Sequence, residues 1–309
     1  MIDGLDSHDP VHALIAVGDG TLYAGRRSGL YCSHDAAVSW RPLIGGSEAP
    51  LPAEVTAVAA APGDTAQATL FAGGQGGLVR STDGGVQWRV CMLPPPPPLV
   101  TAIAVSPAYA ADRVVLVGTA EDGVFRSADR GERWASWNFG LLDLRILALA
   151  LSPAFAVDET VFAATETGIF RSTNGGRAWR EAMIPDCDEP VLCLAISPDY
   201  ATDGLVYAAT ETTGLYRSAD GGMNWEHVTA VAAGAQPVNA ITCISPAEIV
   251  VALADRLVLM QGANAGYLRV VAQWPIDGIT ALTVAPGQAG HRMLVVGDTS
   301  GRIQRLMLP

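Results

Sequence analysis

Short apolar runs alternate with turn-forming residues along most of the chain. In one representative stretch the runs occupy residues 100–105, 114–118, 124–127 and 133–137, with Gly, Asp, Pro and Ser between them. Runs of this length, rich in β-branched residues and bounded by turn residues, predict β-strands. The first run is almost wholly apolar, as is typical of a strand buried on both faces. The stretch therefore predicts a four-stranded antiparallel sheet.

This pattern recurs about every 45 residues. A tryptophan that closes each copy falls at positions 40, 88, 134, 179 and 225, and the innermost runs begin near residues 11, 55, 100, 146, 191, 238 and 279. Units repeated at a fixed period bury their apolar faces against their neighbours. We therefore expect an all-β, seven-bladed β-propeller of four-stranded antiparallel blades that forms one domain over residues 1–309. The seventh unit stops after its third strand, so residues 1–10 are expected to supply the fourth.

A motif Ser-x-Asp-x-Gly-x-x-Trp marks the expected turn between the third and fourth strands. Asp can accept hydrogen bonds from turn amides, Gly can adopt positive φ, and Trp can fold over the turn. Alanines replace both glycines in the first copy, and Asn replaces Asp in the fourth. We assign a structural role to Ser33, Asp35, Trp40, Ser81, Asp83, Gly85, Trp88, Ser127, Asp129, Gly131, Trp134, Ser172, Asn174, Gly176, Trp179, Ser218, Asp220, Gly222 and Trp225.

The motif resembles the Asp-box, or bacterial neuraminidase repeat, of sialidase-like propellers and of propellers similar to photosystem II assembly factors. The resemblance covers roughly residues 11–226. It implies a propeller in which the box is structural and lies away from the binding face. Sialidases also carry an Arg-Ile-Pro motif, whereas the most similar segment of this sequence is Trp40-Arg-Pro-Leu43. Catalytic or metal-binding aspartates in the motif are the disfavoured alternative, because one active site needs different residues from different blades.

Two further features share this period. An arginine precedes the motif serine at Arg80, Arg126, Arg171 and Arg217. It either packs against turn carbonyls and acids or forms an exposed stripe that meets a partner. A companion segment, Ser106–Asp112, recurs at residues 152–158 and 197–203. In an up-and-down sheet it lies on the same face as the motif turns.

The opposite face is the predicted partner-binding surface. Its second-to-third-strand turns carry Glu121, Asp122, Glu166, Glu211, Asp255 and Asp298, with Arg26 and Arg27 in the first unit. The link between the third and fourth units adds Trp137, Phe139, Leu141 and Arg145. Loops on a rigid scaffold commonly carry recognition residues. The alternative, in which these aromatic side chains fold down onto a blade, stays open.

The composition argues against several kinds of catalysis and binding. The formal net charge is −12 and all 19 basic residues are arginine, which excludes a Schiff-base lysine and argues against nucleic-acid binding. No apolar run has the length of a membrane span. The five cysteines show no C-x-x-C spacing, and His8 and His12 alone do not make a metal site, so we predict no metal and no cofactor. The N-terminus does not read as a secretory signal, so a cytoplasmic location is expected.

These observations predict a non-catalytic scaffold that presents an acidic, loop-rich propeller face to a protein partner. A glycoside hydrolase, sialidase-like or using two carboxylates among Glu121, Glu166 and Glu211, is the alternative, with carbohydrate as its ligand. A sensor of a small molecule or metal is the third possibility.

Overall fold

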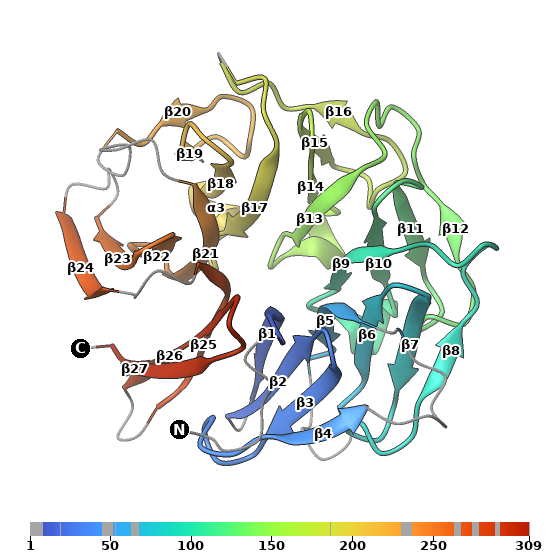
Figure 1. Ribbon diagram of the computed structural model, residues 1–309. Helices are drawn as coiled ribbons and strands as arrows, with labels where there is room; N and C mark the ends of the chain where they lie inside the picture. The colour runs from blue at the N-terminus through green and yellow to red at the C-terminus, as the bar shows by residue number, and fades with distance from the viewer. Residues whose placement is uncertain are drawn as a thin grey trace. The chain divides into compact units, whose positions relative to one another are not determined.

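Seven antiparallel sheets of consecutive strands make up the protein in a computed structural model (Figure 1). The structure describes residues 9–18, 20–44, 52, 54–62, 68–185, 187–229, 237–262, 267–273, 278–287 and 291–308. The fold class is a seven-bladed β-propeller, as the sequence period predicts.

The seven sheets follow the chain order. The first two comprise β1 (Val11–Val17), β2 (Thr21–Arg26), β3 (Gly29–Ser33), β4 (Arg41–Ile44), β5 (Val55–Ala60), β6 (Leu70–Gly74), β7 (Gly77–Ser81) and β8 (Arg89–Cys91). The next three also carry short helices: β9 (Val100–Val105), α1 (Tyr109–Asp112), β10 (Val115–Thr119), β11 (Val124–Ser127), β12 (Ala135–Ser136), β13 (Ile146–Leu151), α2 (Phe155–Asp158), β14 (Val161–Thr165), β15 (Gly168–Ser172), β16 (Arg180–Glu181), β17 (Val191–Ile196), α3 (Tyr200–Asp203), β18 (Val206–Thr210), β19 (Leu215–Ser218) and β20 (Glu226–His227). The last two comprise β21 (Val238–Ser245), β22 (Glu248–Leu253), β23 (Arg256–Gln261), β24 (Tyr267–Gln273), β25 (Ile279–Pro286), β26 (Arg292–Asp298) and β27 (Ile303–Met307).

Six sheets have four strands, and the seventh, β25-β26-β27, has three among the described residues. Residues 9 and 10 are described and belong to no strand. The rest of the segment predicted to complete the seventh sheet, residues 1–8, lies outside the described residues.

The chain divides into two compact units. The first contains Met1–Val115, Ser127–Trp134 and Thr280–Pro309, and the second contains Leu116–Arg126 and Ala135–Ile279. The expectation of a single domain over residues 1–309 stays a prediction.

In the first unit, the last sheet packs against the first. Thr280 Oγ1 donates to the Val11 carbonyl at 2.6 Å and to the Gly297 carbonyl at 3.3 Å. Thr56 makes the same pair of bonds to the carbonyls of Val100 and Gly73 between the second and third sheets, at 2.5 and 3.3 Å. The contact that joins consecutive sheets is therefore repeated between the two ends of the chain.

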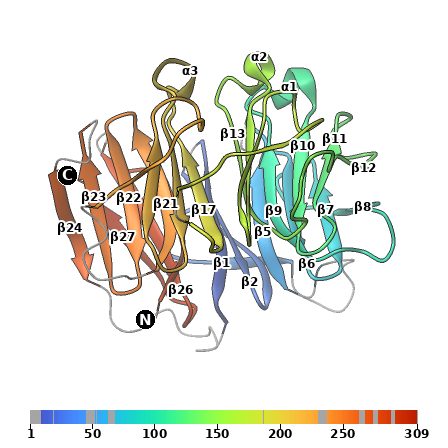
Figure 2. The same cartoon turned by 90° about the horizontal axis from the view of Figure 1, so that it is seen from above.

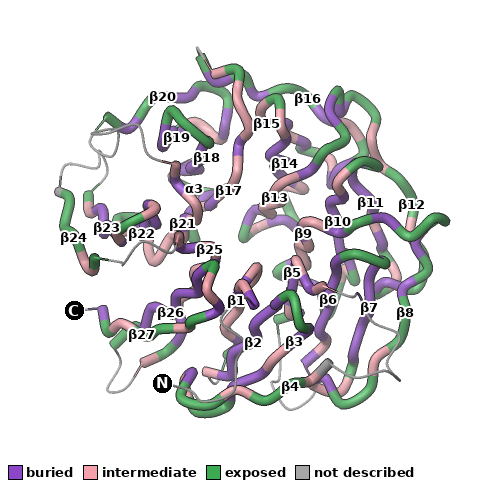
Figure 3. Tube along the Cα trace, viewed as in Figure 1, coloured by how far each residue is buried: buried purple, intermediate pink, exposed green. Residues whose placement is uncertain are grey.

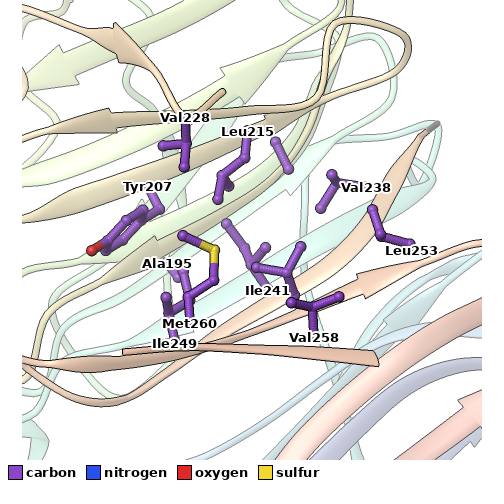
Figure 4. Close-up of a cluster of buried hydrophobic side chains, with 12 residues drawn as sticks. Ala195, Tyr207, Leu215, Val228, Val238, Ile241, Ile249, Leu253, Val258 and Met260 are labelled. Carbon is purple, nitrogen blue, oxygen red and sulfur yellow. The ribbon is translucent and has the colours of Figure 1, made fainter. Parts of the chain in front are cut away.

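The second unit has an apolar core between the fifth and sixth sheets (Figure 4). Tyr207 and Leu215 of the fifth sheet meet Val238, Ile241 and Met260 of the sixth, all in one buried cluster. The alternation of side chains along each strand sends one apolar set to each face, so one sheet buries apolar side chains against its neighbours on both sides.

The second strands are the fully buried ones, whereas the first strands, which were expected to be buried on both faces, are not. Every residue of β6, β10, β14 and β18 is buried, whereas most residues of β9, β13 and β17 are only half-buried (Figure 3). The second strand is paired on both sides within its sheet. The first strand is an edge strand, paired within its sheet on one side only.

The motif turns between the third and fourth strands have one repeated geometry. The motif serine Oγ accepts a hydrogen bond from the amide four residues on, at 2.8–2.9 Å, at Ala37, Gly85, Gly131, Gly176 and Gly222. Asp83 Oδ1 accepts from the amides of Val86 and Gln87 at 3.1 and 2.9 Å, and Asp129 and Asp220 do the same in their copies. The side chains thus satisfy turn amides, as the sequence predicts.

The companion segments lie on the same face as the motif turns, as predicted. Each forms a one-turn helix whose preceding serine donates to its last aspartate, as Ser152 does to Asp158 at 2.6 Å. The amide of Gly175 donates to the carbonyl of Glu159, and Gly221 to Gly204, joining each motif turn to the companion segment of its own sheet. Helices α2 and α3 accordingly lie along one edge of the second unit (Figure 2).

Acid is expected to weaken the motif turns. Hydrogen bonds from the Asn224 backbone and side chain lower the pKa of Asp220 from 3.8 to about 2. Since the pKa in the folded protein lies below the unfolded value, this stabilisation is present above about pH 4 and is lost as the pH falls towards about 2. Thermal melting between about pH 5 and about pH 2 should show the decline.

The fourth motif copy supplies the comparison for this acid effect. Asn174 Oδ1 accepts from the Ala178 amide at 2.9 Å with a side chain that does not titrate. Asp220→Asn should therefore reduce the steepness of the decline in melting temperature. An unchanged pH profile in this variant would contradict the assignment of acid sensitivity to Asp220.

Candidate functional site

The second-to-third-strand turns place most of the predicted acids at the surface of the second unit. Glu121, Asp122, Glu211 and Asp255 are exposed, and Glu166 is partly exposed. No hydrogen bond or ion pair among the described residues joins Glu121, Glu211 or Asp255 to another of the predicted site residues. These acids therefore form separate exposed turns rather than a bonded cluster.

Arg26 and Asp298 are corrections to the predicted partner-binding set, because both side chains are fully buried in the first unit. Arg26 Nη1 lies 3.6 Å from Asp9 Oδ2, and burial lowers the pKa of Arg26 while Asp9 opposes that shift. Asp298 accepts hydrogen bonds from the amides of Ser300 and Arg302, both at 3.0 Å. A partner in solvent cannot reach these two side chains, and only Arg27 of the predicted basic pair is exposed.

Acids on the links between sheets cap the next second-to-third-strand turn. Asp143 Oδ2 accepts from the amide and hydroxyl of Thr167, both at 3.1 Å. Glu189 accepts from the amides of Thr212 and Thr213, both at 2.8 Å. Burial raises the pKa of Glu189, but hydrogen bonds from the hydroxyls of Thr212 and Thr213 and from the Thr213 amide outweigh it and lower the pKa to about 2. These acids were not among the predicted site residues, and their hydrogen bonds hold turns of the predicted binding face.

The link loop, residues 136–145, is held against the fourth sheet by backbone contacts. The amide of Trp179 donates to the Phe139 carbonyl at 2.9 Å, and Trp179 Nε1 donates to the Trp137 carbonyl at 2.7 Å. A side chain at Gly140 would collide with the Trp179 backbone, so the loop lies close to the residue that precedes β16. These hydrogen bonds therefore give the link loop a defined conformation.

Two large apolar side chains of the link loop remain in solvent. Phe139 is 79% exposed and Leu142 is 80% exposed. Trp137 is only half-buried and stacks with the guanidinium groups of Arg126 and Arg177, whose central carbons lie 4.3 and 5.4 Å from its rings. Leu141, proposed with them from the sequence, is buried, which corrects that prediction. Exposed apolar residues grouped on one rigid loop are typical of interaction sites.

Arg145 and Glu166 are the predicted site residues that the structure brings together. Arg145 Nη1 lies 2.5 Å from Glu166 Oε2, and its Nε lies 3.3 Å from Asp143 Oδ1. The pair sits at the end of the link loop, with the Arg145 side chain 51% exposed. It places a charged group on the same loop as Phe139 and Leu142.

A pocket of about 590 Å³ opens beside Phe139 in the second unit. Its lining combines apolar and cationic side chains and comprises Phe139, Arg171, Thr173, Asn174, Ala178, Trp179, Arg180, Glu181, Ala182, Gly222 and Met223. In the sequence, Arg171 stands out only as one of the four periodic arginines. The signal that distinguishes Arg171 from the other three is the set of residues at equivalent positions, since Met223 stands where another copy has Glu132.

Clustered metal-ligand side chains and membrane-spanning helices are both absent from the described part of the chain. Its His, Cys, Asp and Glu side chains nowhere gather in threes as metal ligands would. None of its helices is long and apolar enough to cross a membrane.

Comparison with known proteins identifies the fold. No family model matches the sequence, and no curated protein does. An ancestral GH74 enzyme matches with a TM-score of 0.78 and 19% identity, over 98% of this chain and 45% of that chain. A GH74 enzyme from Niastella koreensis gives 0.75 and 17%, over 98% and 53%. The chain thus spans about half the length of these GH74 structures.

A third solved structure matches along nearly its whole length. YCF48 bound to D1 peptide gives a TM-score of 0.72 at 13% identity, over 98% of this chain and 94% of that chain. At such identities, the likeness in all three cases shows the propeller fold alone.

Proposed function

We propose that this chain is a non-catalytic Asp-box propeller that binds a protein partner through the link loop and the neighbouring acidic turns. The observation that carries the proposal is the exposure of Phe139 and Leu142 on a loop fixed by backbone hydrogen bonds. A rigid loop loses little conformational entropy on binding, so its apolar area contributes to affinity. The exposed acids Glu121 and Asp122, whose turn is bonded to the link loop by Asn138, favour a partner with basic or polar groups.

The repeated motif supports the structural half of this proposal. Its Ser and Asp side chains are engaged in turn hydrogen bonds in five copies, with Asn in the fourth, which suits a scaffold role for an Asp-box. A peptide complex is recorded for YCF48, a propeller that this chain covers almost completely. That likeness supports peptide or protein binding as the use of this fold here.

The test is a comparison of two double variants as bait in an extract of the source organism. Leu142→Ser with Arg145→Ala removes one apolar and one charged group of the link loop. We expect it to lose most of the partner captured by the unchanged protein, about tenfold or more, since interface anchors dominate binding energy. Quantitative mass spectrometry of the captured proteins measures the ratio.

Val86→Ser with Arg89→Ala is the matched control. Like Leu142 and Arg145, Val86 and Arg89 are exposed, and Val86 is 79% exposed. They lie in and next to the motif turn of the second sheet, outside the link loop. This control should capture the partner normally. Equal capture by the link-loop variant would contradict the proposal. Hydrolysis of aryl glycosides that disappears in Glu166→Gln would replace it with the glycoside hydrolase alternative.

A further inference from the structure

Three of the four periodic arginines pair with an acid or stack on an indole ring. Arg80 reaches the next motif turn, where its Nη2 lies 2.5 Å from Glu132 Oε1 and its Nη1 donates to the Arg130 carbonyl. Arg217 pairs with Glu226 of its own fourth strand at 2.8 Å. Arg126 stacks on Trp137. Each copy thus has a negative or aromatic group for its guanidinium.

Arg171 lacks both acids. In the next motif turn, Met223 occupies the position that corresponds to Glu132. On its own fourth strand, Arg180 occupies the position of Glu226 and lies directly across the strand pair from Arg171. Arg171 lies near the Tyr200 hydroxyl and approaches the Phe162 ring at 6.0 Å, but neither group is a carboxylate. Two like charges therefore face each other across the strand pair, as Arg80 and Arg89 do in the second sheet, but Arg171 has no counterpart of the Glu132 that pairs with Arg80.

The described residues leave this arginine pair without an ion pair. Glu181 is the one acid in the pocket lining, and no salt bridge joins it to Arg171 or Arg180. In a chain with a net charge of −12, an uncompensated pair of guanidinium groups is unexpected. Arg180 is exposed and Arg171 half-buried, so an anion entering from solvent meets both.

Apolar side chains surround the arginine pair. Phe139 and Met223, which is 65% exposed, line the same pocket, and Trp179 is buried in its wall. A pocket of about 590 Å³ is within the usual range for ligand sites, roughly 300–1,000 Å³. It accommodates a large apolar side chain together with a neighbouring carboxylate.

We infer that this pocket binds a partner peptide in which a carboxylate lies next to a large apolar side chain. Guanidinium groups form short, paired hydrogen bonds with carboxylates. Phe139 belongs both to the pocket and to the link loop, so a partner on the loop continues into the pocket. The inference deepens the proposed function and rests on it, because it assigns a chemistry to part of the partner.

Isothermal titration calorimetry with the full chain tests the inference. The probe is the N-acetylated peptide Gly-Ser-Leu-Phe with a free carboxyl terminus, and its control is the same peptide with a C-terminal amide. We expect the amide to bind at least about tenfold more weakly, because it removes the charge that pairs with arginine. Met223→Glu restores the acid of the third-sheet motif and should weaken binding of the free peptide by a similar factor. Arg180→Gln should do the same.

Arg89→Gln is the matched control, because Arg89 holds the equivalent position in the second sheet, where Arg80 is paired with Glu132. It should bind the peptide normally. Equal affinity for the amide, unchanged binding by Met223→Glu, or no binding at millimolar peptide would overturn the inference. Phenylpropionate binding as tightly as the peptide would overturn the peptide assignment. Capture lost in the link-loop variant without peptide binding would leave the proposed function standing and refute this one.

Discussion

Replacing Arg26 by methionine is expected to lower the free energy of unfolding by about 3–5 kcal/mol. Arg26 is fully buried, and its guanidinium lies 3.6 Å from Asp9 and 5.4 Å from the centre of the Tyr31 ring. Asp298, also fully buried, contributes a second negative charge that favours the cation. Methionine keeps the apolar stem but leaves two buried carboxylates without this cation. Removal of one partner from a buried ionic group is costly because the remaining charge stays desolvated.

This effect should be visible in urea unfolding followed by tryptophan fluorescence. Arg27→Met is the control, because Arg27 is the adjacent residue and is exposed. We expect that control to change the free energy of unfolding by less than about 0.5 kcal/mol. A loss at Arg26 no greater than the loss at Arg27 would show that the buried ionic group contributes little to stability.

Gly222→Ala is expected to destabilise the protein by about 2–4 kcal/mol, through backbone strain and overpacking together. Gly222 has φ of +84°, where a side chain is strained. A Cβ there would also overlap Cε1 of the Phe162 ring, on which the motif turn packs. The ring is fully buried and edge-on to Tyr200, so it has little room to move.

The repeat offers two matched comparisons for this substitution. Gly131 and Gly176 hold the same place in their motif turns, with φ of +87° and +89°. An added Cβ would lie 2.9 Å from Phe71 at the first and 3.2 Å from Leu116 at the second. Since the backbone strain is nearly the same, the loss should decrease from Gly222→Ala to Gly131→Ala to Gly176→Ala. Equal losses in all three, measured by urea unfolding, would show that strain rather than packing sets the effect.

Much of the local structure could be predicted because it depends on neighbouring residues. The motif serine and aspartate accept hydrogen bonds from amides within four residues, so the turn at Ser81–Asp83 can be predicted from the sequence. The strand starts near residues 11, 55, 100, 146, 191, 238 and 279 follow from the same period. Each is a property of one repeat and needs no knowledge of what the repeat touches.

Burial at the turns could not be predicted this way. Arg26 and Asp298 sit at turn positions equivalent to exposed Glu121 and Glu211, and a charged residue in a turn is usually solvated. Arg26 is buried beside Asp9 and close to Asp298 at the end of β26, and these residues are far apart in the sequence. The predicted turns do lie between the second and third strands, but the expected exposure of these two side chains was wrong.

The sequence by itself determined the repeat, the strand order within each sheet and the hydrogen-bonding role of the motif, because these are set by contacts within about 45 residues. Only the tertiary structure decided which charges are compensated. Arg80 and Arg171 occupy the same position in their repeats, but the next sheet offers Glu132 to one and Met223 to the other. Compensation of Arg80 depends on the distance between side chains of different sheets, and the packing of the sheets sets that distance.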